Sequence, residues 1–269
     1  MTPLLPSFAF LVAPLLLAQG PMAPPAYMRI DKEELKPGHA AAHEATELAW
    51  SRALAKAKAT DHYLGMASMT GPAEAWFILS YSSYADLEAK RVELEKSPEA
   101  AREIGAIALQ DGEHLAGTRT ILMKYRKELS YGPALEIGKM RYMRVRTYRI
   151  KQGQAKAFEE GAKLVHAAME KVEAPGSFAF YEVVGGMGSP TFVALRPFKA
   201  LAEMDALEAA DKAIGEALGE AGRQAMARGY AENVAGVENQ FFAFSPKLSY
   251  PHPSMTASDP EFWTVKEEK

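Results

Sequence analysis

Short segments recur along this chain at a nearly fixed distance. Tyr-Met-Arg-Ile begins at Tyr27 and Tyr-Met-Arg-Val at Tyr142, and Trp-Phe-Ile-Leu at Trp76 matches Thr-Phe-Val-Ala at Thr191, both at an offset of 115 residues. Segments further along the chain match at an offset of 119. This period is much longer than a solenoid unit, so each copy is expected to be a small domain rather than one repeat of an array.

Hydrophobic periodicity and turn residues predict the order β-α-β-β-α-β in each copy. This order is that of a ferredoxin-like unit, an antiparallel sheet with helices on one face. We therefore predict the α+β class, with two tandem ferredoxin-like repeats whose sheets face and cover each other. The expected divisions are a first repeat over 27–131, a linker over 132–138, a second repeat over 139–250 and a C-terminal tail over 251–269. The tail is either mobile or attached to the body through Phe262 and Trp263.

Composition excludes several kinds of function. The net charge is −3 and the chain has no cysteine. A pI near 6.1 argues against a broad surface for nucleic acid. The absence of cysteine excludes disulfides, thiolate metal sites and a cysteine nucleophile.

The first twenty residues resemble an export signal. Residues 8–17 are apolar and too short to span a bilayer, and Ala18 and Gly20 supply the small residues expected before a cleavage site. We expect residues 1–20 to be a signal peptide, cut before Gln19 or before Pro21, and 21–26 to be a linker. The mature protein is then exported to the periplasm or the medium and keeps no stable membrane insertion. The n-region has no Lys or Arg, so a disordered leader or a misassigned start codon is the alternative.

A longer segment carries a family resemblance. Residues 144–153 read Arg-Val-Arg-Thr-Tyr-Arg-Ile-Lys-Gln-Gly and precede a helix that begins with Ala157-Phe158-Glu159. This strand, turn and helix start resemble NIPSNAP-like domains of the dimeric α/β barrel superfamily, which are related to the antibiotic-biosynthesis monooxygenase and EthD-like domains. The resemblance implies that the two repeats form an intramolecular dimeric α/β barrel. The superfamily includes cofactor-free oxygenases, haem enzymes and isomerases, so the resemblance does not assign a reaction.

Two polar residues replace apolar ones on the helix of the first copy. The helix of the second copy places apolar residues, beginning with Phe158 and Ala162, on one stripe that should face the sheet. The repeat offset maps these two positions onto His43 and Glu47. We predict that both side chains point into a recess between helix and sheet, either as paired structural residues or as the lining of a ligand site. His39 lies one turn before His43, a spacing that could also hold a metal with Glu47.

Histidines elsewhere are weaker candidates. His114 lies near a predicted helix end, where the helix dipole alone explains it. Together with His43 it remains a weak catalytic candidate. The haem-binding tandem relatives place their axial histidine in the C-terminal copy, whereas four of the six histidines here lie in the first copy. The sequence therefore supports no metal or cofactor assignment.

The first strand of each copy has two distinct faces. Tyr142, Arg144, Arg146 and Tyr148 alternate with apolar residues, and Asp31 and Glu33 occupy the matching positions of the first copy. We expect the apolar face to meet the helices and the Tyr/Arg face to line the space between the sheets. The arginines would then either pair with Asp31 and Glu33 or form an anion site.

The leading interpretation is an exported protein that binds a small apolar or amphipathic molecule in a pocket of the first repeat. Such pockets combine apolar walls with a few polar groups. The alternatives are a cofactor-independent monooxygenase-like enzyme, a structural or homo-oligomeric assembly domain and, last, a haem or metal protein. The candidate ligand-binding residues are His43, Glu47, Trp50, Trp76, Arg144 and Arg146.

Overall fold

The computed structural model describes residues 22–95 and 97–266, so the predicted signal peptide lies outside the described residues. Each half of the chain has the predicted order of strands and helices, except that two helices instead of one precede the last strand of the first half. The first half contains β1 Tyr27–Leu35, α1 Ala40–Ala57, β2 Tyr63–Ser68, β3 Glu74–Tyr81, α2 Tyr84–Glu95, α3 Pro98–Gly112 and β4 Leu115–Tyr125. The second half contains β5 Tyr142–Ile150, α4 Ala155–Lys171, β6 Ala179–Gly185, β7 Thr191–Phe198, α5 Glu203–Asn233 and β8 Val234–Phe244. Two short 3-10 turns, Lys127–Leu129 and Ile137–Lys139, lie between the halves, and two short helices follow, α6 Pro253–Ser258 and α7 Pro260–Trp263.

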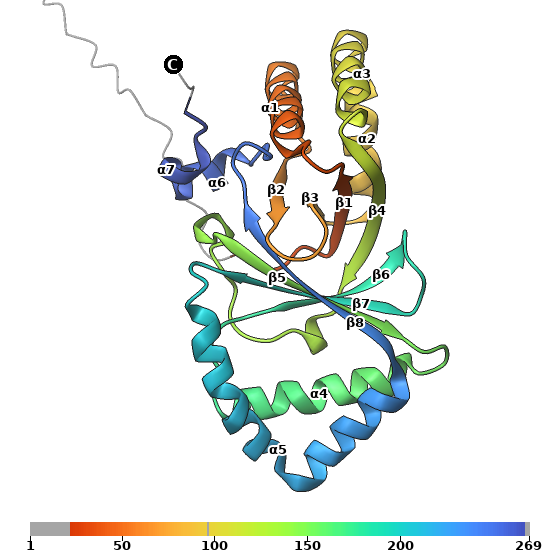
Figure 1. Cartoon of the computed structure of the whole chain (residues 1–269), viewed down its shortest axis with the longest axis vertical. Coiled ribbons are helices and arrows are strands. Elements are labelled where there is room, and N and C mark those ends of the chain that lie inside the picture. Colours follow the sequence, from red (N-terminus) through yellow and green to blue (C-terminus); the bar gives the residue numbers. More distant parts are fainter. Residues whose placement is uncertain (1–21, 96, 267–269) are drawn as a thin grey trace, which may run out of the picture.

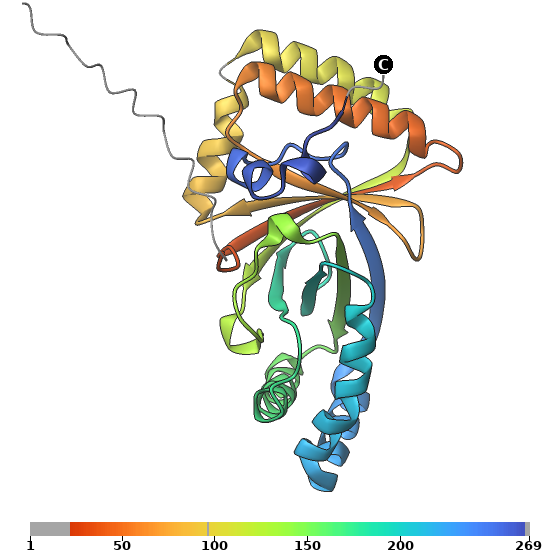
Figure 2. The same cartoon turned by 90° about the vertical axis from the view of Figure 1, so that its left-hand side faces the viewer.

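The eight strands form one closed antiparallel barrel in the order β1-β3-β2-β8-β5-β7-β6-β4. The expectation of two sheets that only face each other was wrong in this respect. The four strands of each half join the other half at both edges, through β2 with β8 and through β4 with β6. Closure pairs strand edges that would otherwise be exposed. Helices α1 to α3 cover the barrel on one side, and α4 and α5 cover it on the opposite side (Figure 1, Figure 2).

The barrel interior is the main core, and all eight strands contribute to it. Met28 and Ile30 of β1 and Met143 and Val145 of β5 point inward and are buried. The prediction that these apolar faces meet the helices was therefore wrong. A closed barrel this small is filled by side chains and excludes water, so the apolar residues of each strand point inward.

Strand register also corrects the alignment of the two halves. Lys32 pairs with Trp76, whereas Thr147, the residue 115 positions after Lys32, pairs with Val193. The positional counterpart of Trp76 is thus Val193, two residues beyond the Thr191 that the sequence match indicated.

The C-terminal tail is attached to the barrel. Trp263 is 3% exposed and belongs to the barrel core, and its Nε1 donates a hydrogen bond to the carbonyl oxygen of Gly138 at 2.7 Å. Asp259 forms an ion pair with Arg141, whose guanidinium lies over the ring of Phe262. Of the two alternatives for the tail, the structure shows attachment through Phe262 and Trp263.

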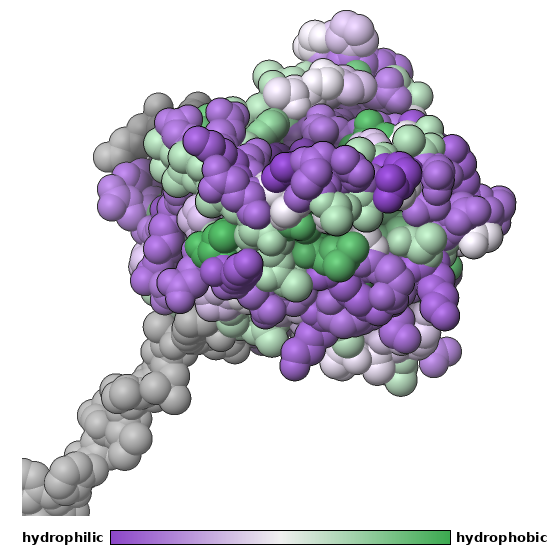
Figure 3. All heavy atoms as spheres, turned by 90° about the horizontal axis from the view of Figure 1, so that it is seen from below, coloured by the Kyte–Doolittle hydropathy of each residue, from purple (hydrophilic) through white to green (hydrophobic). Residues whose placement is uncertain are grey.

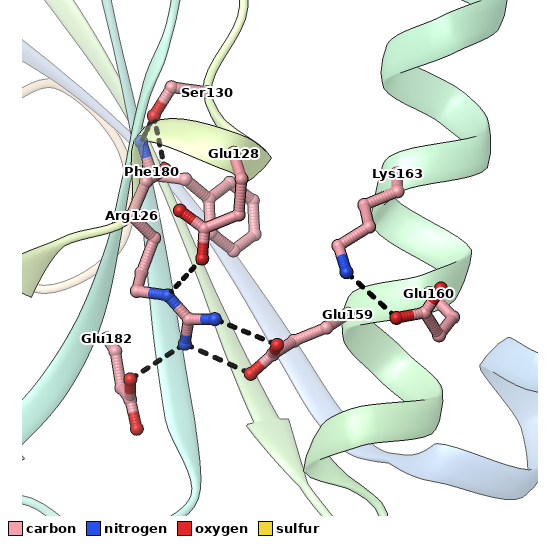
Figure 4. A network of polar contacts seen from close by, with 8 residues as sticks. All are labelled: Arg126, Glu128, Ser130, Glu159, Glu160, Lys163, Phe180 and Glu182. Carbon is pink, nitrogen blue, oxygen red and sulfur yellow. Dashed lines mark hydrogen bonds and ion pairs between the residues drawn. The ribbon is translucent and has the colours of Figure 1, made fainter.

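A polar network fixes α4 to the barrel (Figure 4). Arg126, just after β4, makes a bidentate contact with Glu159 of α4 at 2.8 and 3.0 Å. The same guanidinium contacts Glu128 and Glu182. Bidentate pairing gives this contact a defined geometry.

The α4 and α5 side of the molecule keeps hydrophobic surface exposed (Figure 3). Leu164, Met226 and Tyr230 are among its exposed large side chains. Within α5, Asn233 is the one buried residue, and Gly219 interrupts the helix with φ near 66°. α5 is therefore a kinked and lightly buried cover. No helix in the described part of the chain is both long and apolar enough to cross a bilayer.

Candidate metal centre

Helix α1 turns a mixed face toward the sheet. His43 and Glu47 are one turn apart and are 1% and 6% exposed, so both point inward as predicted. Ala53 and Leu54, further along α1, are buried in the apolar cluster between helices and sheet. The buried face of α1 is therefore polar near its N-terminus and apolar near its C-terminus.

Two more acidic residues meet His43 and Glu47 from other elements. His43 Nε2 lies 2.8 Å from Glu33 Oε2 on β1 and 3.8 Å from Asp111 Oδ1 in the last turn of α3. The Thr46 hydroxyl lies within hydrogen-bonding distance of the Asp111 carboxylate and can donate to it. Glu33, His43, Glu47 and Asp111 each offer a ligand atom, and these four atoms lie within 4.8 Å of one another. Three elements thus bring three carboxylates and one imidazole to a single buried point.

The electrostatics of this cluster are unfavourable without a cation. Burial, together with the charges of Glu33 and Asp111, raises the pKa of Glu47 to about 9. Burial also raises the pKa of Glu33, while its hydrogen bond to His43 opposes that rise. Carboxylates that share a site with little water cannot all ionise at neutral pH. The cluster therefore holds at least one proton or attracts a cation.

Unpartnered polar atoms also point to a bound group. The Glu47 side chain is 6% exposed and lies beside the ligand atoms of Glu33, His43 and Asp111. The Tyr63 hydroxyl is buried without a hydrogen-bond partner among the described residues, and burial, followed by the charges of Glu47 and Glu33, raises its pKa. A buried polar group without a partner costs about 1–3 kcal/mol. A metal ion with its bound water would satisfy such groups, so the residues present fit a metal.

The predicted metal set was only partly right. His39 does not join His43 and Glu47, because its Nδ1 lies 3.1 Å from Nδ1 of His114. His39 and His114 form a separate half-buried pair at the start of α1 and the end of α3. His114, the weaker catalytic candidate, is therefore not part of the four-residue cluster.

The Tyr/Arg faces of β1 and β5 do not meet inside the barrel. They lie on the outer face of the barrel, under the helices, because the apolar faces fill the interior. Asp31 instead forms an ion pair with Arg29 of its own strand at 2.7 Å. The prediction that Asp31 and Glu33 share a layer with Arg144 and Arg146 was therefore wrong.

The two tryptophans do not line one pocket either. Trp76 lies inside the barrel, 3% exposed, against Phe242. Trp50 is half-buried on α1 and contacts the apolar cluster between helices and sheet. The barrel wall separates them, so the predicted combination of Trp50 and Trp76 with His43 in one recess is wrong.

Glu33 and Asp111 are the cluster members that sequence reasoning did not assign to the site. Alternation along β1 places Glu33 on the same face as Asp31, which is a usable signal once the outer face is known. Asp111 gives no comparable signal, because only the packing of α3 beside α1 brings it to His43.

Comparison with known proteins supports the fold. No protein family and no curated protein matches the sequence. A candidate monooxygenase from Fusobacterium nucleatum subsp. nucleatum has a similar structure, with a TM-score of 0.53 and 8% identity over 83% of this chain and 94% of that one. An anthrone oxidase-like protein gives a TM-score of 0.51 and 11% identity over 81% and 90%. A variant of chlorite dismutase from Candidatus Nitrospira defluvii gives 0.50 and 10% over 84% and 94%. These likenesses confirm a mixed α+β fold with a closed barrel, and at such low identity they show the fold alone.

Proposed function

We propose that this protein binds a divalent transition-metal ion through Glu33, His43, Glu47 and Asp111. The observation that carries this proposal is the convergence of four ligand atoms within 4.8 Å in a buried position. Three carboxylates and one imidazole form a mixed oxygen and nitrogen set. Such a set suits Mn²⁺, Fe²⁺ or Zn²⁺ better than Ca²⁺, which prefers oxygen ligands alone, or Cu⁺, which prefers sulfur.

The charges support the same proposal. A divalent ion would replace the proton that burial holds on the cluster and would offset the repulsion among its three carboxylates. The side chain of Glu33 is 19% exposed, against 1% for His43 and 6% for Asp111. Glu33 is thus the ligand nearest to water, and its side is where an ion or a small substrate would approach.

Metal titration of the purified chain tests the proposal. We expect one Mn²⁺ or Zn²⁺ per chain by calorimetry after treatment with a chelator, and at least tenfold weaker binding in Asp111→Asn. Glu44→Gln is the matched control, because it removes a carboxylate next to His43 that pairs with Lys247 outside the cluster. Equal binding by Asp111→Asn and Glu44→Gln, or no stoichiometric binding by the wild type, would contradict the proposal.

A cofactor-independent, monooxygenase-like activity is the second candidate. His43 with its Glu33 partner at 2.8 Å has the arrangement of an oriented general base. Two of the structurally similar proteins are described as a candidate monooxygenase and as anthrone oxidase-like. Oxygen uptake with anthrone that persists in a chelator and is lost in His43→Phe would favour this candidate. Uptake that requires added metal would favour the metal centre.

Several finer expectations remain proposals from the sequence. We propose that the two halves arose by duplication of one NIPSNAP-like, ferredoxin-like unit, in support of which the two halves share one order of strands and helices, apart from a second helix before the last strand of the first half. We propose export through residues 1–20, which predicts that protein recovered from the periplasm or medium begins at Gln19 or Pro21. Recovery of exported protein that begins at Met1 would contradict cleavage. Binding of a small amphipathic molecule and homo-oligomerisation are likewise proposals.

A further inference from the structure

Three arginines gather on the outer face of the second half of the barrel. Arg144 and Arg146 lie on β5 and Arg196 on β7, all on the side that faces α4 and α5. Arg144 lies directly opposite Arg196 in the strand register. Like charges directly opposite each other on a sheet destabilise it, so this arrangement needs a compensating partner.

No carboxylate in the described part of the chain forms an ion pair with any of the three. Arg144 contacts the sulfur of Met204 on α5, at 3.9 Å. Arg146 donates to Asn239 Oδ1 at 2.6 Å, and Arg196 donates to the carbonyl oxygen of Pro175 at 3.4 Å. Most of the donors on these guanidinium groups are therefore not used by the protein.

Several other arginines of the described chain are paired with carboxylates. Arg126 contacts three carboxylates, Arg141 contacts Asp259, and Arg149 contacts Glu238 at 2.7 Å. Arg149 is on the same strand as Arg144 and Arg146 and is 54% exposed, yet it has an acidic partner. Arg119 on β4 also has no ion pair among the described residues, but it is exposed, whereas Arg196 is buried. The three arginines are therefore distinguished by sharing one face with a buried member.

Burial makes an unpaired positive charge on Arg196 more unfavourable. Arg196 is 7% exposed, and its guanidinium lies over the ring of Phe178 at 4.9 Å. Burial and the charges of Arg144 and Arg146 lower its pKa to about 10, so it still carries its charge at neutral pH. The charge of Asp211 opposes this fall in pKa, but Asp211 forms no ion pair with Arg196. A buried charge without a closely paired counter-ion is unfavourable and is retained when something pairs with it.

We propose that Arg144, Arg146 and Arg196 bind the oxyanion head of an organic anion between the second half of the sheet and α5. Arginine suits this role because its planar donors match carboxylate and phosphate oxygens. Phe178 beside Arg196 and Tyr148 beside Arg146 offer aromatic surface for the body of the ligand. The light burial of α5 and its kink at Gly219 leave this cover able to adjust to a ligand. The site is separate from the metal centre, which lies in the other half of the chain.

Titration with phenyl phosphate and with inorganic phosphate tests the proposal on the intact chain. We expect phenyl phosphate to bind at least tenfold more tightly than inorganic phosphate, with an affinity that falls as salt rises. Arg196→Met should weaken phenyl phosphate binding at least tenfold. Arg149→Gln is the matched control, since it removes one positive charge from the same strand outside the site, and it should bind as the wild type does.

Thermal unfolding distinguishes a ligand site from a structural role. If Arg196 is kept for a ligand, Arg196→Met should unfold at the same or a higher temperature without ligand and should lose the rise that phenyl phosphate gives the wild type. Arg144→Gln provides the same comparison at a half-buried position if Arg196→Met does not fold. Binding by these variants equal to that of Arg149→Gln, equal affinity for the two phosphates, or no binding by the wild type would each overturn the proposal.

Discussion

The replacement Glu47→Gln tests the electrostatics of the buried cluster directly. Glutamine keeps the shape of the side chain and removes its ionisable group. The pKa of Glu47 is about 9 in the folded protein, against an ordinary value of 4.5. Between these values the folded state holds a proton that the unfolded state releases. The contribution of Glu47 to the stability of the metal-free wild type is therefore largest below pH 4.5 and falls as pH rises toward 9.

The size of the effect follows from the width of that window. Each pH unit inside it costs about 1.4 kcal/mol, so raising the pH by about two units near neutrality should cost the wild type roughly 3 kcal/mol. The free energy of unfolding of Glu47→Gln should fall much less over the same pH range. A smaller loss should remain, because the pKa of Glu33 is raised as well.

Urea unfolding in the presence of a chelator, at pH values near 6, 7 and 8, measures this difference. Glu44→Gln, whose carboxylate lies outside the cluster, should follow the wild type. Added Mn²⁺ or Zn²⁺ should restore stability to the wild type at the highest pH, since binding to the folded state alone stabilises it. Parallel pH dependence in Glu47→Gln and wild type would refute the reasoning.

Two further replacements test the packing around the barrel. Trp263→Ala should lower the free energy of unfolding by about 3–5 kcal/mol in urea titrations, because it empties a core position and removes the hydrogen bond of the indole to the Gly138 carbonyl. A loss below about 1 kcal/mol would mean that the tail is not part of the core. Gly65→Ala should lower the free energy of unfolding by about 3 kcal/mol or more, because the added Cβ would lie 2.2 Å from the Leu248 carbonyl oxygen. Gly112→Ala is the control, because its Cβ meets open space, and it should leave the free energy of unfolding unchanged in the same urea titration.

The sequence predicted the elements and their order well. Turn residues such as Gly38 and Gly153, which adopt positive φ, separate each first strand from its helix. The faces of the strands were harder. Alternation in β5 separates Arg144 and Arg146 from Met143 and Val145, but it does not tell which side is closed off from water.

Sequence reasoning predicted only those site residues that lie together on one helix. His43 and Glu47 share a face of α1 because of helical periodicity, and that inward face is visible in sequence. Asp111 comes from a helix more than sixty residues away, and its contact with Thr46 depends on how α3 lies beside α1. Arg196 shows the same limit, because its position opposite Arg144 requires the register of β5 and β7. Contacts between elements are set by tertiary packing, which local patterns do not record.

Closure of the barrel makes the two halves of the chain interdependent. A fragment that ends before β5 would expose the edges of β2 and β4 together with the apolar face that fills the barrel. The complementary fragment would expose the matching edges of β8 and β6. Neither half is then a stable unit in isolation, and each supplies the surface that the other lacks. Two such fragments expressed together should therefore assemble into a non-covalent pair. Likewise, when the backbone is cleaved between β4 and β5, the two halves should stay associated.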